Sequence, residues 1–171
     1  MPPHATHPPV LPQVLIPPGF VCVPREGARL MAVIAAGVAL TVYDRFRRMG
    51  GMGHYLHPRR RRGQSSALYA APAIVTLIEA FLSTGSRPGD LETAIYGGAE
   101  NPGAPGYEPG RGRANVAAAC EVMRKLGISP GSMDTAGRRA RKIIFHTATG
   151  ESWIARVSRS RAGDWYPPLP S

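Results

Sequence analysis

The sequence predicts an α/β protein in which a mixed β-sheet forms the core together with two main helices. Residues 32–43 form a nearly continuous apolar run rich in valine and alanine, which is typical of a strand buried on both faces. Residues 72–83 and 116–126 instead carry apolar side chains at helical spacing. Strand-like segments precede, separate and follow these two helical segments. Strands and helices are therefore expected to share one core.

The chain of 171 residues is long enough for one domain with a substantial core. Seven of the first 19 residues and three of the last six are proline, which favours extended, unpacked chain. We therefore expect a tail at 1–13, a folded domain at 14–157 and a second tail at 158–171. The sequence has no secretory signal pattern and no run of roughly 20 apolar residues, so a cytoplasmic protein that does not span a membrane is predicted.

The predicted central strand spans residues 29–43 and is followed by a polar turn at 44–48. The neighbouring strand is expected at 52–56. It carries His54 in a glycine-rich surrounding, which permits close approach of the backbone.

The remaining elements follow from local patterns. Pro17 and Pro18 confine the first strand, 14–23, to a sheet edge because proline cannot donate to a ladder. Pro72 suits the start of the first helix, and Asn115 is a suitable N-cap for the second. Further predicted elements are a strand at 91–96, a loop at 101–113, and a closing hairpin of strands 142–146 and 152–157 around Thr149-Gly150.

The formal net charge is +10, and arginine contributes most of the positive charge. Clusters lie at Arg45–Arg48, at Arg59–Arg62 and at residues 138–142. Such a surface attracts acidic partners, although a solvated charged loop gives the same pattern. Aromatic residues are not interleaved with the arginines, which argues against a platform for single-stranded nucleic acid.

The titratable residues give no support for a metal or another cofactor. Cys22 and Cys120 are far apart in a chain without an export signal, so both are expected to be free thiols. The five histidines show no ligand spacing with carboxylates or cysteines. No cofactor is therefore predicted.

The segment AAGVALTVYD followed by GGMGHYLHP resembles the chemoreceptor glutamine deamidase family, CheD. Members have a strand with G-S-C-V, a later aspartate and then G-x-x-H-x-x-L-P. The segments at 111–115 and 134–141 are similar to the family motifs I-G-x-R-N and D-x-G-G-x-x-x-R, and Thr149-Gly150 also matches. The resemblance covers roughly residues 14–157. It implies an α/β sandwich, or α+β sandwich, with a mixed sheet and two helices.

Aligned without gaps, the resemblance puts the family histidine at His54 and the family aspartate at Asp44. The catalytic cysteine falls on Gly37, and the assisting threonine falls on Met31. Deamidation of glutamine needs a thiolate nucleophile, a histidine to transfer the proton and donors for the oxyanion. Gly37 has no side chain to attack with, and Met31 cannot hydrogen-bond the imidazole. The resemblance therefore implies a degenerate member of the family.

We interpret the chain as a pseudo-deamidase that retains a partner-binding surface at Ala35, Ala36, Gly37 and His54. The partners implied by the resemblance are chemoreceptor cytoplasmic helices or a CheC-type phosphatase. Two alternatives stay open. The chain could be an active deamidase with another nucleophile, for which Cys22, Cys120 and Thr41 are the candidates, or a basic protein that binds nucleic acid or lipid.

Overall fold

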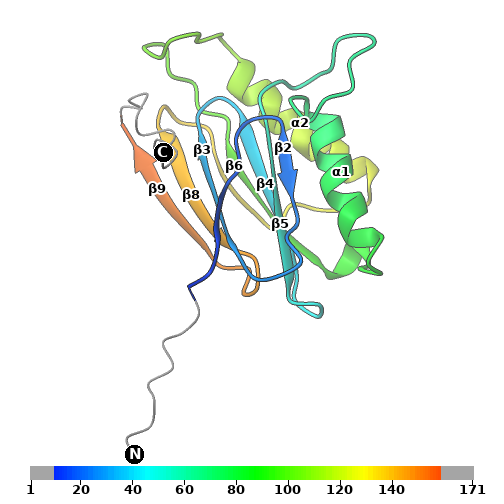
Figure 1. Cartoon of the computed structure of the whole chain (residues 1–171). Helices are drawn as coiled ribbons and strands as arrows, with labels where there is room; N and C mark the ends of the chain where they lie inside the picture. The colour runs from blue at the N-terminus through cyan, green and yellow to red at the C-terminus, as the bar shows by residue number, and fades with distance from the viewer. Residues whose placement is uncertain (1–9, 159–171) are drawn as a thin grey trace, which may run out of the picture.

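Two β-sheets pack face to face, and both main helices cover the outer face of one sheet, in the computed structural model that describes residues 10–158 (Figure 1). The four-stranded sheet has the order β1 (Gln13–Leu15), β3 (Arg29–Ile34), β8 (Ala140–His146), β9 (Ser152–Val157). The five-stranded sheet has the order β2 (Phe20–Cys22), β5 (Met49–Tyr55), β4 (Val38–Asp44), β6 (Leu91–Gly97), β7 (Ser132–Thr135). The helices are α1 (Ala70–Leu82), α2 (Arg111–Lys125) and the short 3₁₀ helix η1 (Pro88–Asp90).

The sheets are mixed, because β1 pairs with β3 and β6 with β7 in parallel while the other neighbouring strands are antiparallel. This confirms the predicted fold class of a mixed β-sheet core with two main helices. The predicted tails fall mainly on residues 1–9 and 159–171, which lie outside the described part of the chain.

Strand β4 is the centre of the fold and is buried on both faces, as the apolar run predicts. Val38, Leu40 and Val42 belong to the cluster that packs against the helices. Ala39 and Tyr43 belong to the cluster between the two sheets. Alternation along one strand therefore serves two hydrophobic cores, which explains why nearly every residue of β4 is apolar.

Two predicted strands are each broken in two, and these predictions were wrong. The chain leaves the four-stranded sheet after β3, turns at Ala35–Gly37 and enters the five-stranded sheet as β4. The segment predicted as one strand at 14–23 likewise becomes β1 and β2, which lie at the edges of different sheets. Pro17 and Pro18 lack a backbone N–H, and Gly19 has φ +88°. Strand pairing is therefore interrupted between β1 and β2.

The second helix starts earlier than predicted, and the N-cap assigned to Asn115 was wrong. Helix α2 begins at Arg111, so Asn115 lies inside its second turn and is fully buried. Gly112 permits this start because a Cβ there would lie 2.7 Å from the carbonyl oxygen of Ala99. The first helix also begins earlier, at Ala70, which puts Pro72 third in the helix, where an N–H would still have no intrahelical acceptor.

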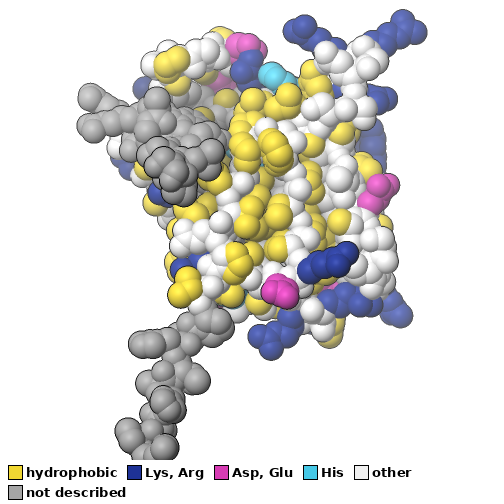
Figure 2. Space-filling view, in the orientation of Figure 1, with side chains coloured by type: hydrophobic (Ala, Val, Ile, Leu, Met, Phe, Trp, Pro, Cys, Tyr) yellow, Lys and Arg dark blue, Asp and Glu magenta, His cyan; other side chains and the backbone are white. Residues whose placement is uncertain are grey.

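The other predicted elements are confirmed, with small differences at their ends. Strands β5 and β6 and the hairpin of β8 and β9 lie where the sequence predicts them. Residues 59–65 form an exposed loop between β5 and α1. In Figure 2, lysine and arginine side chains protrude at both ends of the molecule, whereas hydrophobic side chains gather between these ends.

Asp44 is the last residue of β4 and not part of an exposed turn, contrary to the prediction of a turn at 44–48. Its carboxylate accepts hydrogen bonds from the backbone N–H groups of Phe46 and Arg47, at 2.9 and 3.0 Å, and from the hydroxyl of Ser86 at 2.5 Å. Burial raises the pKa of Asp44, but these hydrogen bonds more than offset it, so the pKa is lowered overall. Asp44 therefore fixes the turn between β4 and β5, at the opposite end of β4 from Gly37.

Candidate functional site

A pocket of about 180 Å³ lies where the chain crosses between the two sheets. Its floor is formed by Ala35, Ala36 and Gly37 from the β3–β4 turn and by His54 from β5. The segment 101–107 and the side chain of Arg111 contribute the opposite wall. The structure thus brings together the four residues that the sequence assigns to partner binding.

His54 is oriented by a backbone carbonyl. The residue is 1 % exposed, and its Nδ1 lies 3.0 Å from the carbonyl oxygen of Ile16. Because a carbonyl only accepts, Nδ1 must carry the proton, which leaves the lone pair on Nε2. Burial lowers the pKa of His54, and the hydrogen bond to Ile16 opposes this only in part. At neutral pH the imidazole is therefore uncharged, with Nε2 as an acceptor.

Gly37 lies directly in front of this acceptor. A Cβ built on Gly37 would be 3.5 Å from Nε2 of His54, so a side chain at this position would start next to the imidazole. The same Cβ would lie 2.6 Å from the carbonyl oxygen of Tyr55 and 3.1 Å from Cδ2 of Leu56. No side chain fits at position 37 unless the backbone of the β5 end shifts. The geometry of the turn therefore requires glycine at position 37.

The carbonyl groups of the β3–β4 turn are all held by hydrogen bonds. The N–H groups of Ala99 and Gly98 donate to the carbonyls of Ala35 and Gly37, each at 2.9 Å. The remaining carbonyl, that of Ala36, accepts from the side-chain amide of Asn115 at 2.8 Å. The turn is thus fixed from the β6–α2 connection and from α2 itself.

Asn115 is the functional residue that sequence reasoning missed. Its amide nitrogen donates to the carbonyls of both Ala36 and Leu56, at 2.8 and 2.9 Å, and so ties the β3–β4 turn to the end of β5. The hydroxyl of Tyr55 donates to the backbone carbonyl of Asn115 at 2.6 Å. The available signal was the Gly112-x-x-Asn115 spacing within the family-like motif. That spacing puts a close-packing glycine and a buried amide near one face of the same helix.

Met31 does not line the pocket. It lies on β3 between Leu30 and Ala32, both of which point into the core between the sheets, so its side chain points to the other face of the sheet. Its carbonyl accepts the N–H of Ile16 at 2.7 Å, and the carbonyl of Ile16 in turn holds His54. Residue 31 is therefore linked to the imidazole through the backbone alone.

The three candidate substitute nucleophiles also lie outside the pocket. Cys22 and Cys120 are half-buried free thiols, and burial raises the pKa of Cys22, which disfavours its thiolate. Thr41 is buried on β4 and lines a different cavity. Among the described residues, 10–158, those that line the His54 pocket include no cysteine, serine or threonine. The arrangement offers a hydrogen-bond acceptor at Nε2 and no side-chain hydroxyl of serine or threonine, or thiol, to attack a substrate.

Within residues 10–158, no group of three or more His, Cys, Asp or Glu side chains is placed to hold a metal ion. Neither α1 nor α2 has the length and hydrophobicity that a membrane-crossing helix requires, as far as the described residues extend.

Comparison with known proteins gives a consistent result. Residues 56–156 match the family described as CheD chemotactic sensory transduction. A probable chemoreceptor glutamine deamidase CheD 2 of Geobacter sulfurreducens is 32 % identical over 154 residues, which covers 90 % of this chain and 96 % of that protein. A probable chemoreceptor glutamine deamidase CheD 1 of Anaeromyxobacter dehalogenans is 31 % identical over 145 residues, 85 % of each chain. The corresponding protein of Jannaschia sp. is 34 % identical over 126 residues, 73 % of this chain and 70 % of that protein.

The contact between Gly37 and Tyr55 predicts the effect of adding a single methyl group. We expect Gly37→Ala to lower the free energy of unfolding by about 1–3 kcal/mol, because the new Cβ overpacks against backbone. The matched control is Gly89→Ala, since a Cβ at Gly89 would meet nothing within 4 Å. Urea denaturation of both variants measures the difference. Equal stability of the two would contradict the closed geometry of the turn.

The two hydrogen bonds of Asn115 predict a local effect. In Asn115→Ala, the half-buried carbonyls of Ala36 and Leu56 lose their donor, at a cost of about 1 kcal/mol for each hydrogen bond. The turn should loosen, so the amides of Gly98 and Ala99 should exchange with solvent deuterium faster than in the wild type. The amide of Thr147, which donates to Ala28 far from this turn, serves as the control. Unchanged exchange at Gly98 and Ala99 would contradict a clamp by Asn115.

Proposed function

The chain belongs to the CheD family, and from this premise we propose that it acts in chemotactic signal transduction by binding a protein partner without deamidating it. The observation that supports the absence of chemistry most strongly is the pocket itself. It retains a buried, oriented imidazole but offers Gly37 where the family resemblance requires a cysteine. Loss of a nucleophile typically lowers the rate of a covalent mechanism by several orders of magnitude.

The pocket remains suited to binding an amide side chain. Nε2 of the neutral His54 can accept a hydrogen bond from the NH₂ group of a glutamine side chain, whereas a carboxylate would face the lone pair and be repelled. The pocket of about 180 Å³ provides space for such a side chain next to Gly37. We therefore propose that the remnant site holds a partner's glutamine in place of converting it.

The partners that fit this function are the cytoplasmic helices of a chemoreceptor or a CheC-type phosphatase, and the proposed location is the cytoplasm. The relatives from Geobacter sulfurreducens and Anaeromyxobacter dehalogenans carry names that describe an activity on chemoreceptor glutamines. An active deamidase with another nucleophile is less well supported here, because Cys22, Cys120 and Thr41 do not line the pocket that contains His54.

Isothermal titration calorimetry tests this function. The wild-type protein is titrated with a chemoreceptor cytoplasmic fragment and, separately, with a CheC-type phosphatase from the same organism. We expect saturable binding to one of them. Filling the pocket by Ala104→Leu should weaken that binding at least tenfold, because Ala104 lines the pocket. Ala117→Leu adds the same side chain on the exposed side of α2 and should leave the affinity unchanged.

Two results would contradict the proposal. If the wild type binds neither protein, the binding function is wrong. If Ala104→Leu binds as tightly as the wild type, the partner does not use this pocket.

A further inference from the structure

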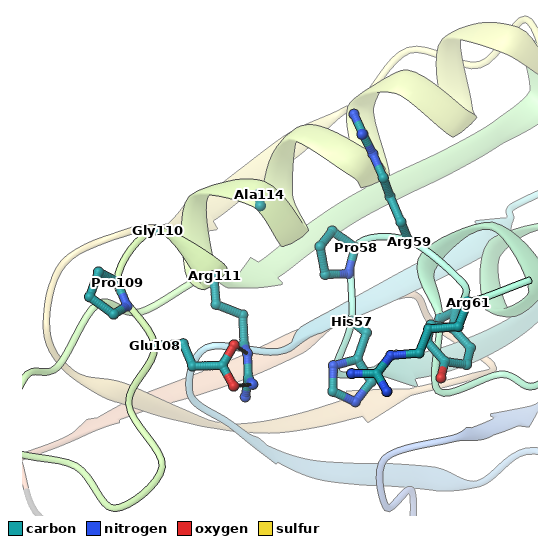
Figure 3. A pocket seen from close by; sticks show the side chains of 10 residues that line it. His57, Pro58, Arg59, Arg61, Glu108, Pro109, Gly110, Arg111 and Ala114 are labelled. Carbon is teal, nitrogen blue, oxygen red and sulfur yellow. Dashed lines mark hydrogen bonds and ion pairs between the residues drawn. The ribbon is translucent and has the colours of Figure 1, made fainter.

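A second, larger hollow of about 610 Å³ shares a lining residue with the His54 pocket, and its lining includes three arginines and a histidine. Arg111, in the first turn of α2, lines both hollows. Figure 3 shows His57 and Arg61, from the loop after β5, across from Glu108 and Arg111, whereas the side chain of Arg59 extends away from them alongside α2. The two hollows thus lie on either side of a shared residue, Arg111.

The charge in this hollow is unbalanced. In the described part of the chain, Glu108 is the only carboxylate that lines it, and both of its oxygens are bound by the guanidinium group of Arg111. Within residues 10–158, neither Arg59 nor Arg61 forms an ion pair. Glu108 is therefore outweighed by Arg61 and Arg111, and the guanidinium group of Arg61 remains available to an anion. The guanidinium group of Arg59 extends alongside α2, where its charge acts on Glu121.

The pKa of His57 reflects the same positively charged surroundings. Burial lowers its pKa, the positive charges of Arg111 and Arg61 lower it further, and Glu108 opposes this in part. The ring of His57 lies against Tyr69, with centroids 5.4 Å apart. The hydroxyl of Tyr69 donates to the side chain of Gln64. The ring of Tyr69, which lines the hollow, is therefore already packed against His57.

We infer that this hollow, defined by His57, Arg59, Arg61 and Arg111, binds carboxylate side chains of an acidic protein segment whose neighbouring residue enters the His54 pocket. This inference rests on the proposed function, because the same partner occupies both hollows. A guanidinium group pairs with a carboxylate in a two-pronged geometry, as Arg111 already does with Glu108. Acidic residues next to the bound side chain would thus supply affinity and fix the register of the partner.

An acidic peptide fits better than nucleic acid for two reasons. Arg61 and Arg111 both lie close enough to His57 to lower its pKa, whereas binding along a phosphate backbone uses a stripe of cations. A single-strand site also needs open aromatic faces for stacking bases, and Tyr69 is packed against His57. The chemistry of the hollow is therefore that of a few carboxylates at a defined place.

The test uses two double variants of the same loop. Arg59→Ala/Arg61→Ala removes the two arginines of the loop that line the hollow. Arg60→Ala/Arg62→Ala removes two exposed arginines that do not line it, so both variants lose the same charge. The probe is a fluorescein-labelled 15-residue peptide rich in glutamate, compared with its all-glutamine counterpart and with a 15-nucleotide single strand. Binding is measured by fluorescence anisotropy at fixed salt, and the titration is repeated with the chemoreceptor fragment.

We expect Arg59→Ala/Arg61→Ala to weaken binding of the glutamate-rich peptide at least tenfold and Arg60→Ala/Arg62→Ala to weaken it less than threefold. Equal losses of affinity in the two variants would overturn the inference, because the overall positive charge of the loop would then account for binding. Tighter binding of the single strand than of the acidic peptide would also overturn it and would assign the surface to nucleic acid.

The same data separate this inference from the proposed function. If the chemoreceptor fragment binds both double variants as it binds the wild type, the proposed function stands and the acidic-segment site is wrong. If the chemoreceptor fragment does not bind but the glutamate-rich peptide still binds Arg59→Ala/Arg61→Ala more weakly than Arg60→Ala/Arg62→Ala, the site stands and the proposed function is wrong.

Discussion

The side-chain amide of Asn115 is the contact on which the geometry of the site depends. It donates to Ala36, in the turn where the chain changes sheets, and to Leu56, just beyond the strand that carries His54. These two segments belong to different elements, and the buried amide in α2 holds both. Together with the N–H groups of Gly98 and Ala99, this residue helps to fix the position of His54 relative to Gly37.

Around this clamp, the proposed function assigns recognition of a partner to groups that remain in place. The imidazole of His54 is still held in one tautomer by the carbonyl of Ile16, a contact that no side-chain substitution at position 31 removes. The reacting position is different, because Gly37 lies so close to Tyr55 that a side chain would have no room. On the proposed function, the site keeps its shape and its hydrogen bonds without a nucleophile at position 37.

The sequence predicted those parts of the fold that depend on local pattern. Strand β4 and helix α1 were found because the spacing of their apolar residues follows directly from which face is buried. The breaks at Ala35–Gly37 and Pro17–Gly19 were not predicted, because apolar residues continue on both sides of each break. Periodicity does not reveal that a strand has passed to another sheet. Asn115 was placed at a helix start because asparagine favours that position. In the structure it instead donates to the carbonyls of Ala36 and Leu56, which are far away in the sequence.

The site was predictable to a similar degree. The resemblance indicated Gly37 and His54, and the structure puts them next to each other. The orienting partner of His54 is a backbone carbonyl, which leaves no trace in the residue type of Ile16. The basic hollow was visible in the sequence only as a run of arginines. Which of these arginines line the hollow depends on the conformation of the loop that follows His57, and the sequence alone does not reveal that conformation.

The most direct test of the central claim is mass spectrometry of a chemoreceptor cytoplasmic domain after incubation with the wild-type protein, with a catalytically competent family member as positive control. The readout is the conversion of glutamine amide to acid at each site. We predict no conversion above the rate without protein, while the control converts its glutamines. Clear conversion by the wild type would contradict the account, because a nucleophile outside the residues that line the His54 pocket would then have to reach it.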